Sequence, residues 1–136
     1  NCGFMTVHIA AASLASENKS MAHPASVDSI PTTANQEDHV SMATFGARRL
    51  KPMAENTEGV LAIEILCAAQ AADIQNILNG EQDLPPRVQP IMDGVRQRVD
   101  SLIEDRPIAP DIEHMRDWMQ SDDFRVFMVE GALPSA

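Results

Sequence analysis

Residues 60–78 read VLAIEILCAAQAADIQNIL, and this stretch decides the fold class. As a helix, it would carry apolar or small side chains on every face, with few polar interruptions. A helix that is apolar all round is buried on most of its sides. The stretch therefore predicts the central helix of a bundle, and the Asn79 and Gly80 that follow it are a typical helix stop.

The helical pattern continues on the N-terminal side of this stretch, back to about residue 37. Pro52 interrupts it, because proline cannot donate a hydrogen bond to the carbonyl of Arg48, at a cost of about 3 kcal/mol in a helix interior. We therefore expect a kink or a break at Pro52. Residues 3–19 are also apolar or small nearly all round, which predicts a second helix that needs neighbours on most sides.

The segment between these two helices has the composition of an ordered loop. Pro24 and Pro31 remove backbone donors, and the Ser, Asp, Thr and Asn residues around them favour turns. Loops as long as residues 21–36 are uncommon in compact domains and often carry function.

Shorter helices are expected in the C-terminal part. After the two prolines at 85–86, apolar residues recur at spacings of three and four over 88–103, which predicts a helix with one apolar face. Pro107 and Pro110 end this pattern, and one more short helix is expected around 112–119.

These patterns predict an all-α fold built as a bundle of long helices. We expect residues 1–80 to supply the central helices of the bundle, and residues 81–136 to form amphipathic helices packed on it. The chain has no initiator methionine, and its apolar pattern is already running at Phe4. We therefore expect it to be a fragment of a larger all-helical protein.

Charge and hydropathy make two classes of partner improbable. The chain has 20 acidic and 10 basic residues and a formal net charge of −10, which repels phosphate backbones, so we expect no nucleic-acid binding. Residues 4–15 are apolar, but they are fewer than the roughly 20 that span a bilayer and no basic region precedes them. We expect neither a membrane anchor nor a signal peptide.

Cysteine and histidine spacing predicts no metal site. Cys2 and Cys67 lie far apart among apolar neighbours, which is typical of small buried residues in a protein of the reducing cytoplasm. His23 has no further ligand at metal-binding spacing, and we expect it to be a loop histidine bonded to the backbone.

Residues 22–42 read AHPASVDSIPTTANQEDHVSM, with NCGFM at the start of the chain and ATFGARRLKPMAENTEGVLAIEILCAAQA directly after the run. This sequence resembles the aromatic amino acid ammonia-lyases, and within them most closely the histidine ammonia-lyases. The resemblance is strong over residues 1–78 and weaker beyond Gly80. A contiguous match of this length is highly specific.

The resemblance implies an all-helical homotetramer whose active sites combine residues from several chains. It also implies a 4-methylidene-imidazol-5-one (MIO) prosthetic group, which the family forms from an Ala-Ser-Gly tripeptide. This sequence contains no Ala-Ser-Gly, and it has no tyrosine, although the family uses one near the substrate. We therefore expect the group to come from another part of the protein and this chain alone to be inactive.

Three residues are candidates for the active site, and the resemblance implies an active-site loop over residues 21–39. The family's catalytic glutamate corresponds to Glu37, which at a loop-to-helix junction can act as an ion partner or a base, or can simply cap the helix. Gln36 is a candidate substrate contact because an amide both donates and accepts hydrogen bonds, with a loop or capping bond as the alternative. Met5 matches a position that lines the substrate pocket, with core packing as the alternative.

Asp38 and His39 resemble an acid–base pair, but we expect them to be structural. Adjacent residues on a helix point about 100° apart, so at most one of them would face a pocket.

We expect the parent protein to eliminate ammonia from L-histidine to give urocanate, a step of histidine catabolism. Tyrosine ammonia-lyase or an aminomutase of the same family is one alternative, and a non-catalytic helical assembly module, such as a truncated paralogue, is another. The expected partners are a small amino acid substrate, the remainder of the lyase chain and homo-oligomer partners.

Overall fold

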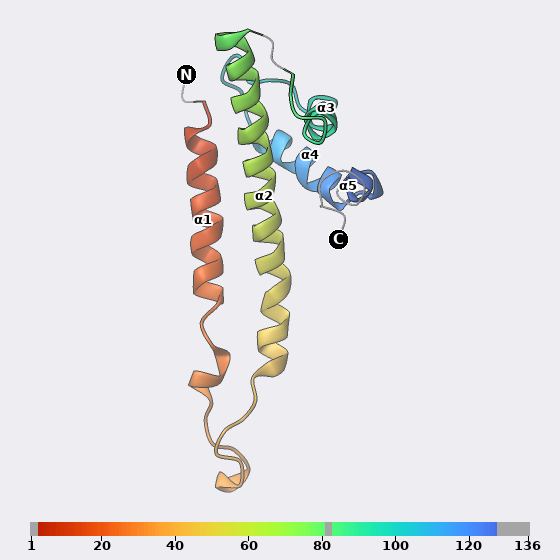
Figure 1. Cartoon of the computed structure of the whole chain (residues 1–136). Coiled ribbons are helices and arrows are strands. Elements are labelled where there is room, and N and C mark those ends of the chain that lie inside the picture. Colours follow the sequence, from red (N-terminus) through yellow and green to blue (C-terminus); the bar gives the residue numbers. More distant parts are fainter. Residues whose placement is uncertain (1–2, 81–82, 128–136) are drawn as a thin grey trace.

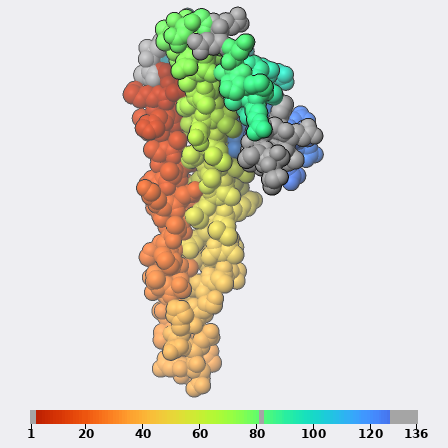
Figure 2. All heavy atoms as spheres, viewed as in Figure 1, coloured from red at the N-terminus to blue at the C-terminus, as the bar shows by residue number. Residues whose placement is uncertain are grey.

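Two long antiparallel helices dominate the computed structural model, which describes residues 3–80 and 83–127 (Figure 1). Helix α1 spans Met5–Met21 and helix α2 spans Ala43–Asn79. The two helices lie side by side and are joined at one end by a long loop, as the ribbon and the space-filling view both show (Figure 2). The described residues contain no strand, so the expected all-α fold is confirmed.

Of the kink or break expected at Pro52, the break is wrong, because α2 runs through this residue without interruption. Pro52 and Arg48 are both exposed, so water can replace the donor that the proline ring removes. Immediately after the proline, Asn18 of α1 donates from Nδ2 to the carbonyl oxygen of Met53 at 3.1 Å. This contact joins the two helices one residue after Pro52.

Close backbone approach brings α1 and α2 together. A Cβ atom on Gly59 would lie 2.9 Å from Cδ1 of Leu14, so only glycine fits there without movement of that side chain. Nearby, Asn56 donates from Nδ2 to Oε2 of Glu17 at 3.0 Å and to Oδ1 of Asn18 at 3.1 Å. Small residues and side-chain amides thus fix the spacing of the two helices.

Much of the apolar surface of this pair is left uncovered within the chain. On α1, Met5 and Ile9 are 58% and 61% exposed, and on α2 Ile77 and Leu78 are 79% and 75% exposed. Of the helices in the described ranges, α2 is the one long and apolar enough by composition to cross a membrane. The same property is typical of a helix at the centre of a large bundle. The expectation that both helices need further neighbours is consistent with this exposure.

Three short helices follow α2; the first two pack directly against it, and the third packs on the second (Figure 1). They are α3, Gln89–Arg96; α4, Ala109–Gln120; and α5, Asp122–Phe127. Buried side chains of α2, α3 and α4, with one residue just after α3, form one core, and its members are Ala62, Leu66, Ala69, Val95, Val99, Met115 and Trp118. The core therefore lies along the C-terminal half of α2, away from the long loop.

The amphipathic helix expected over residues 88–103 is shorter than predicted and ends at Arg96. Polar residues of α2 explain the difference. The Asp73 carboxylate forms an ion pair with Arg96, whose Nη2 lies 2.7 Å from Oδ2 of Asp73. The same carboxylate accepts a hydrogen bond from the Ser101 hydroxyl. The Gln70 amide pairs with the Leu102 backbone in both directions, at 3.1 and 2.8 Å. These contacts draw the chain after Arg96 back onto α2, so the helix cannot continue.

Gly94 gives a test of this core. A Cβ atom there would lie 2.5 Å from Cζ2 of the buried Trp118, so we expect Gly94→Ala to destabilise the full-length protein by about 1–3 kcal/mol. Gly46→Ala is the matched control, because Gly46 lies inside α2 with no atom within 4 Å of its added Cβ. That control should be neutral or stabilising by about 0.4–1 kcal/mol. Urea unfolding measures both, and equal effects would contradict the packing described.

Candidate functional site

The loop of residues 22–42 extends past the end of α1 and returns to the start of α2 (Figure 1). It contains two short 3₁₀ helices, η1 at Ala25–Asp28 and η2 at Thr33–Asn35. The chain reverses direction at η2, which forms the tip of the molecule. The sequence expectation of an ordered loop is therefore confirmed.

Backbone pairing closes this tip. Thr32 N donates to the carbonyl oxygen of Glu37 at 2.9 Å, and Glu37 N donates back to Thr32 at 3.4 Å. The three residues between Thr32 and Gln36 all have positive φ, with Thr33 at 52°, Ala34 at 54° and Asn35 at 66°. Left-handed backbone costs non-glycine residues roughly 1–2 kcal/mol each, and such strain clusters at functional sites.

Glu37 does not cap a helix, so the junction predicted from sequence is wrong. Helix α2 begins only at Ala43, six positions later, and Met42 occupies its N-cap position. Glu37 is instead exposed at the tip, paired through its backbone with Thr32. The helix-capping alternative for this carboxylate is thereby removed.

Gln36 lies beside Glu37 and is also exposed. Its backbone N donates to the Thr33 carbonyl at 3.1 Å. Asp38 and His39 are not helical, so the argument that helical geometry separates their directions does not apply. Both are exposed.

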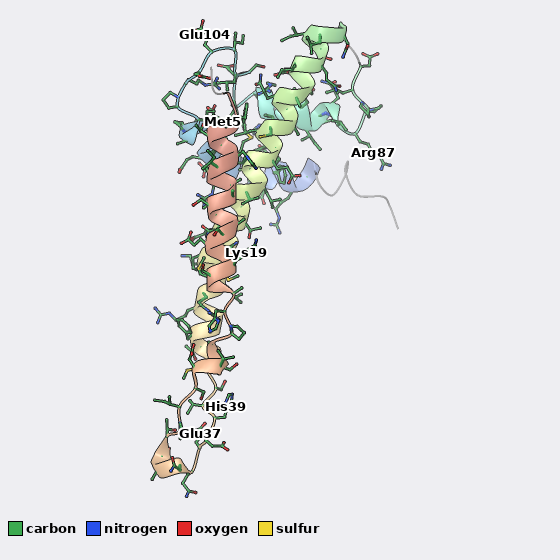
Figure 3. The ribbon with its side chains drawn as sticks, turned by 90° about the vertical axis from the view of Figure 1, so that its left-hand side faces the viewer. Met5, Lys19, Glu37, His39, Arg87 and Glu104 are labelled. Atoms are coloured by element: carbon green, nitrogen blue, oxygen red, sulfur yellow. The ribbon has the colours of Figure 1, made fainter. Side chains whose placement is uncertain are left out.

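Met5 is far from these residues. It lies in the first turn of α1, whereas Glu37 lies beyond the opposite end of that helix (Figure 3). The 17 residues of α1 alone span about 25 Å at 1.5 Å per residue. One copy of this chain therefore does not bring Met5 together with Gln36 and Glu37.

A depression of about 390 Å³ lies at the base of the loop, where the chain enters α2. Its polar lining consists of Ser26, His39, Ser41 and Arg49. Arg49 donates from Nη1 to the His23 carbonyl at 2.6 Å, which ties α2 to the start of the loop. The lining offers hydroxyl, imidazole and guanidinium groups that can hydrogen-bond to a neighbouring chain or ligand.

The remaining candidates carry little chemistry. His23 lies in the loop, as expected, but its imidazole Nε2 lies 3.4 Å from Oδ2 of Asp28 rather than on a backbone group, and its own carbonyl accepts from Arg49. Within the described ranges, no three His, Cys, Asp or Glu side chains are grouped to hold a metal ion. Burial raises the pKa of the Cys67 thiol, which keeps it protonated and unreactive. Cys2 lies outside the described residues.

Residues 1–97 match the sequence model of a family described as aromatic amino acid lyase. The chain belongs to this family. Curated relatives named histidine ammonia-lyase are 50% identical in Psychromonas ingrahamii and 52% identical in Shewanella oneidensis, each over 99% of this chain. The chain spans only 26% of the length of these relatives.

Solved lyase structures have the same fold. Histidine ammonia-lyase from Trypanosoma cruzi superposes with a TM-score of 0.87 at 38% identity, over 99% of this chain and 26% of its own. Tyrosine aminomutase from Streptomyces globisporus superposes with a TM-score of 0.80 at 32% identity, over 98% of this chain and 24% of its own. Similarity to lyases therefore extends well beyond Gly80, farther than the sequence pattern indicated.

Proposed function

We propose that this chain is the part of a histidine ammonia-lyase that supplies the Glu37 loop, and that the full protein converts L-histidine to urocanate and ammonia. The curated relatives at 50% and 52% identity carry that name. The observation that carries the site is the exposed Glu37 carboxylate, at the tip of a loop closed by its own backbone pairing. A strained and ordered tip suits a group that must be presented to a partner surface.

The distance between the candidate residues supports a site built from several chains. Met5 and Glu37 lie at opposite ends of the α1 rod (Figure 3). If both line a substrate pocket, each copy contributes Met5 to one pocket and Glu37 to another. The exposed apolar surface on α1 and α2 supports the homo-oligomer that this arrangement needs, and we propose a homotetramer.

The MIO group would come from residues outside this chain, because the sequence has no Ala-Ser-Gly. When present, the group supplies the electrophile of the elimination. None of the described residues can form it, and our proposal for this chain concerns proton transfer and binding. The Glu37 carboxylate would pair with the substrate ammonium or accept a proton, and the Gln36 amide would orient the substrate through hydrogen bonds.

Substrate identity has one competing candidate. The tyrosine aminomutase similarity raises tyrosine as a substrate, whereas the greater identity to histidine ammonia-lyases favours histidine. We expect the full-length protein to form urocanate from L-histidine, and to turn over L-tyrosine at least about 10²-fold less efficiently, as a site built to hydrogen-bond one ring rejects another. Absorbance assays of both reactions measure kcat/KM. Preference for L-tyrosine would overturn the assignment.

A further inference from the structure

Two hydrogen bonds between Ser29 and Val40 bridge the loop a second time, and we call this pair of bonds the Ser29 rung. Thr32 and Glu37 are paired through their backbones near the tip. Ser29 lies three positions before Thr32 and Val40 three positions after Glu37, so both are farther from the tip. The Ser29 hydroxyl donates to the Val40 carbonyl at 3.0 Å and accepts from Val40 N at 2.7 Å. One side chain thus satisfies both backbone groups of the residue opposite it.

The rest of the loop supports this rung. Ser29 N donates to the Ser26 carbonyl at 3.2 Å, which ties Ser29 to η1. At the base, Arg49 of α2 holds the His23 carbonyl. A series of contacts therefore runs from α2 through η1 and Ser29 to the loop segment that carries Glu37. Both hydrogen bonds between Ser29 and Val40 are partly buried, so water replaces them poorly if the hydroxyl is removed.

Beyond this rung, three backbone hydrogen bonds close the tip. Two join Thr32 and Glu37, the longer at 3.4 Å, and one runs from Gln36 N to the Thr33 carbonyl at 3.1 Å. Those bonds must hold three consecutive left-handed residues in place. Without the Ser29 rung, the strain at Thr33, Ala34 and Asn35 would be relieved by opening of the tip. The Glu37 carboxylate would then lose its fixed position.

We propose that Ser29 is a positioning residue, which holds the carboxylate of Glu37 where the reaction needs it. This inference rests on the proposed role of Glu37. A displacement of about 1 Å at a catalytic group can cost on the order of 10²-fold in rate. Ser29 itself touches no substrate in this proposal, and it acts through Val40 and the Thr32–Glu37 pair.

The test compares Ser29→Ala with Ser29→Thr in the full-length lyase. Ser29→Ala should lower kcat by roughly 10- to 10²-fold with KM changed by less than about threefold, because the lost contact orders a catalytic group rather than binding substrate. Ser29→Thr keeps the hydroxyl, and the extended backbone at Ser29, φ −65° and ψ 139°, accepts a β-branched residue. It should restore kcat.

Hydrogen–deuterium exchange of peptides covering residues 33–42 gives a second readout. Exchange should be faster in Ser29→Ala and normal in Ser29→Thr. Ser20→Ala is the matched control, because it removes an exposed hydroxyl that donates to Ser16 within α1. It should leave both kcat and exchange unchanged.

Two results would overturn the inference, and they differ in what they say about Glu37. If Ser29→Ala speeds exchange but keeps normal kcat while Glu37→Gln is inactive, Ser29 is structural and the role of Glu37 stands. If Glu37→Gln keeps normal kcat, the proposed role of Glu37 fails, and the positioning role of Ser29 fails with it.

Discussion

Replacing Glu37 by alanine in the full-length lyase should lower kcat by about 10²–10⁴-fold, the contribution typical of a general acid or base. The same variant should unfold at an unchanged temperature. Glu37 is exposed and lies six positions before the first residue of α2, so its side chain neither packs in a core nor caps a helix. Surface substitutions of this kind usually change stability by less than about 0.5 kcal/mol.

Two further variants sharpen this test. Glu37→Gln keeps the shape and the hydrogen-bonding ability but removes the charge, so a loss equal to that of Glu37→Ala would show that the charge matters. Asp38→Ala removes the adjacent exposed carboxylate and should keep near-normal kcat. Steady-state kinetics with L-histidine and thermal melts measure all three. Normal turnover by Glu37→Ala would show that the site assignment is wrong.

The isolated 136-residue chain should form no urocanate at all. The proposed elimination would depend on an electrophile formed from Ala-Ser-Gly, which this sequence lacks. The separation of Met5 from Glu37 adds a second reason, since one chain leaves its candidate residues apart. Absorbance of urocanate is the measurement, with the full-length lyase as the positive control. Turnover above background by the purified chain would contradict both reasons.

The sequence predicted the long central helix well and its interruptions poorly. The all-round apolar pattern of residues 60–78 located the C-terminal half of α2 and its end, at Asn79. The break expected at Pro52 did not occur, and Asn18 on α1 contacts α2 at the next residue, Met53. Local propensity cannot register a contact with a residue 35 positions away.

Periodicity also overestimated the helix after Pro86. Its apolar spacing continues to Ile103, but Gln70 and Asp73 of α2 capture the backbone and side chains after Arg96. In the sequence these two polar residues were only interruptions of an apolar stretch. Their partners, Arg96, Ser101 and Leu102, come next to them only when the chain after α3 lies against α2.

The loop of residues 22–42 was located from sequence, but its shape was not. Prolines and turn-forming residues indicated a loop, whereas the acidic run around Glu37 was mistaken for the start of a helix. The left-handed run at Thr33, Ala34 and Asn35 contains no glycine, so the usual signal for positive φ is absent. The rung formed by Ser29 depends on a long-range register that composition does not reveal.

Complementation between two inactive variants tests most directly whether the site is shared between chains. Full-length Glu37→Ala and Met5→Asp should each have little activity alone, because each damages every pocket of its own homo-oligomer. Co-expressed and assembled together, they should regain a substantial fraction of wild-type turnover, since some pockets then receive intact Met5 from one chain and intact Glu37 from the other. Activity no greater than the sum of the separate variants, in oligomers shown to be mixed, would contradict the shared site.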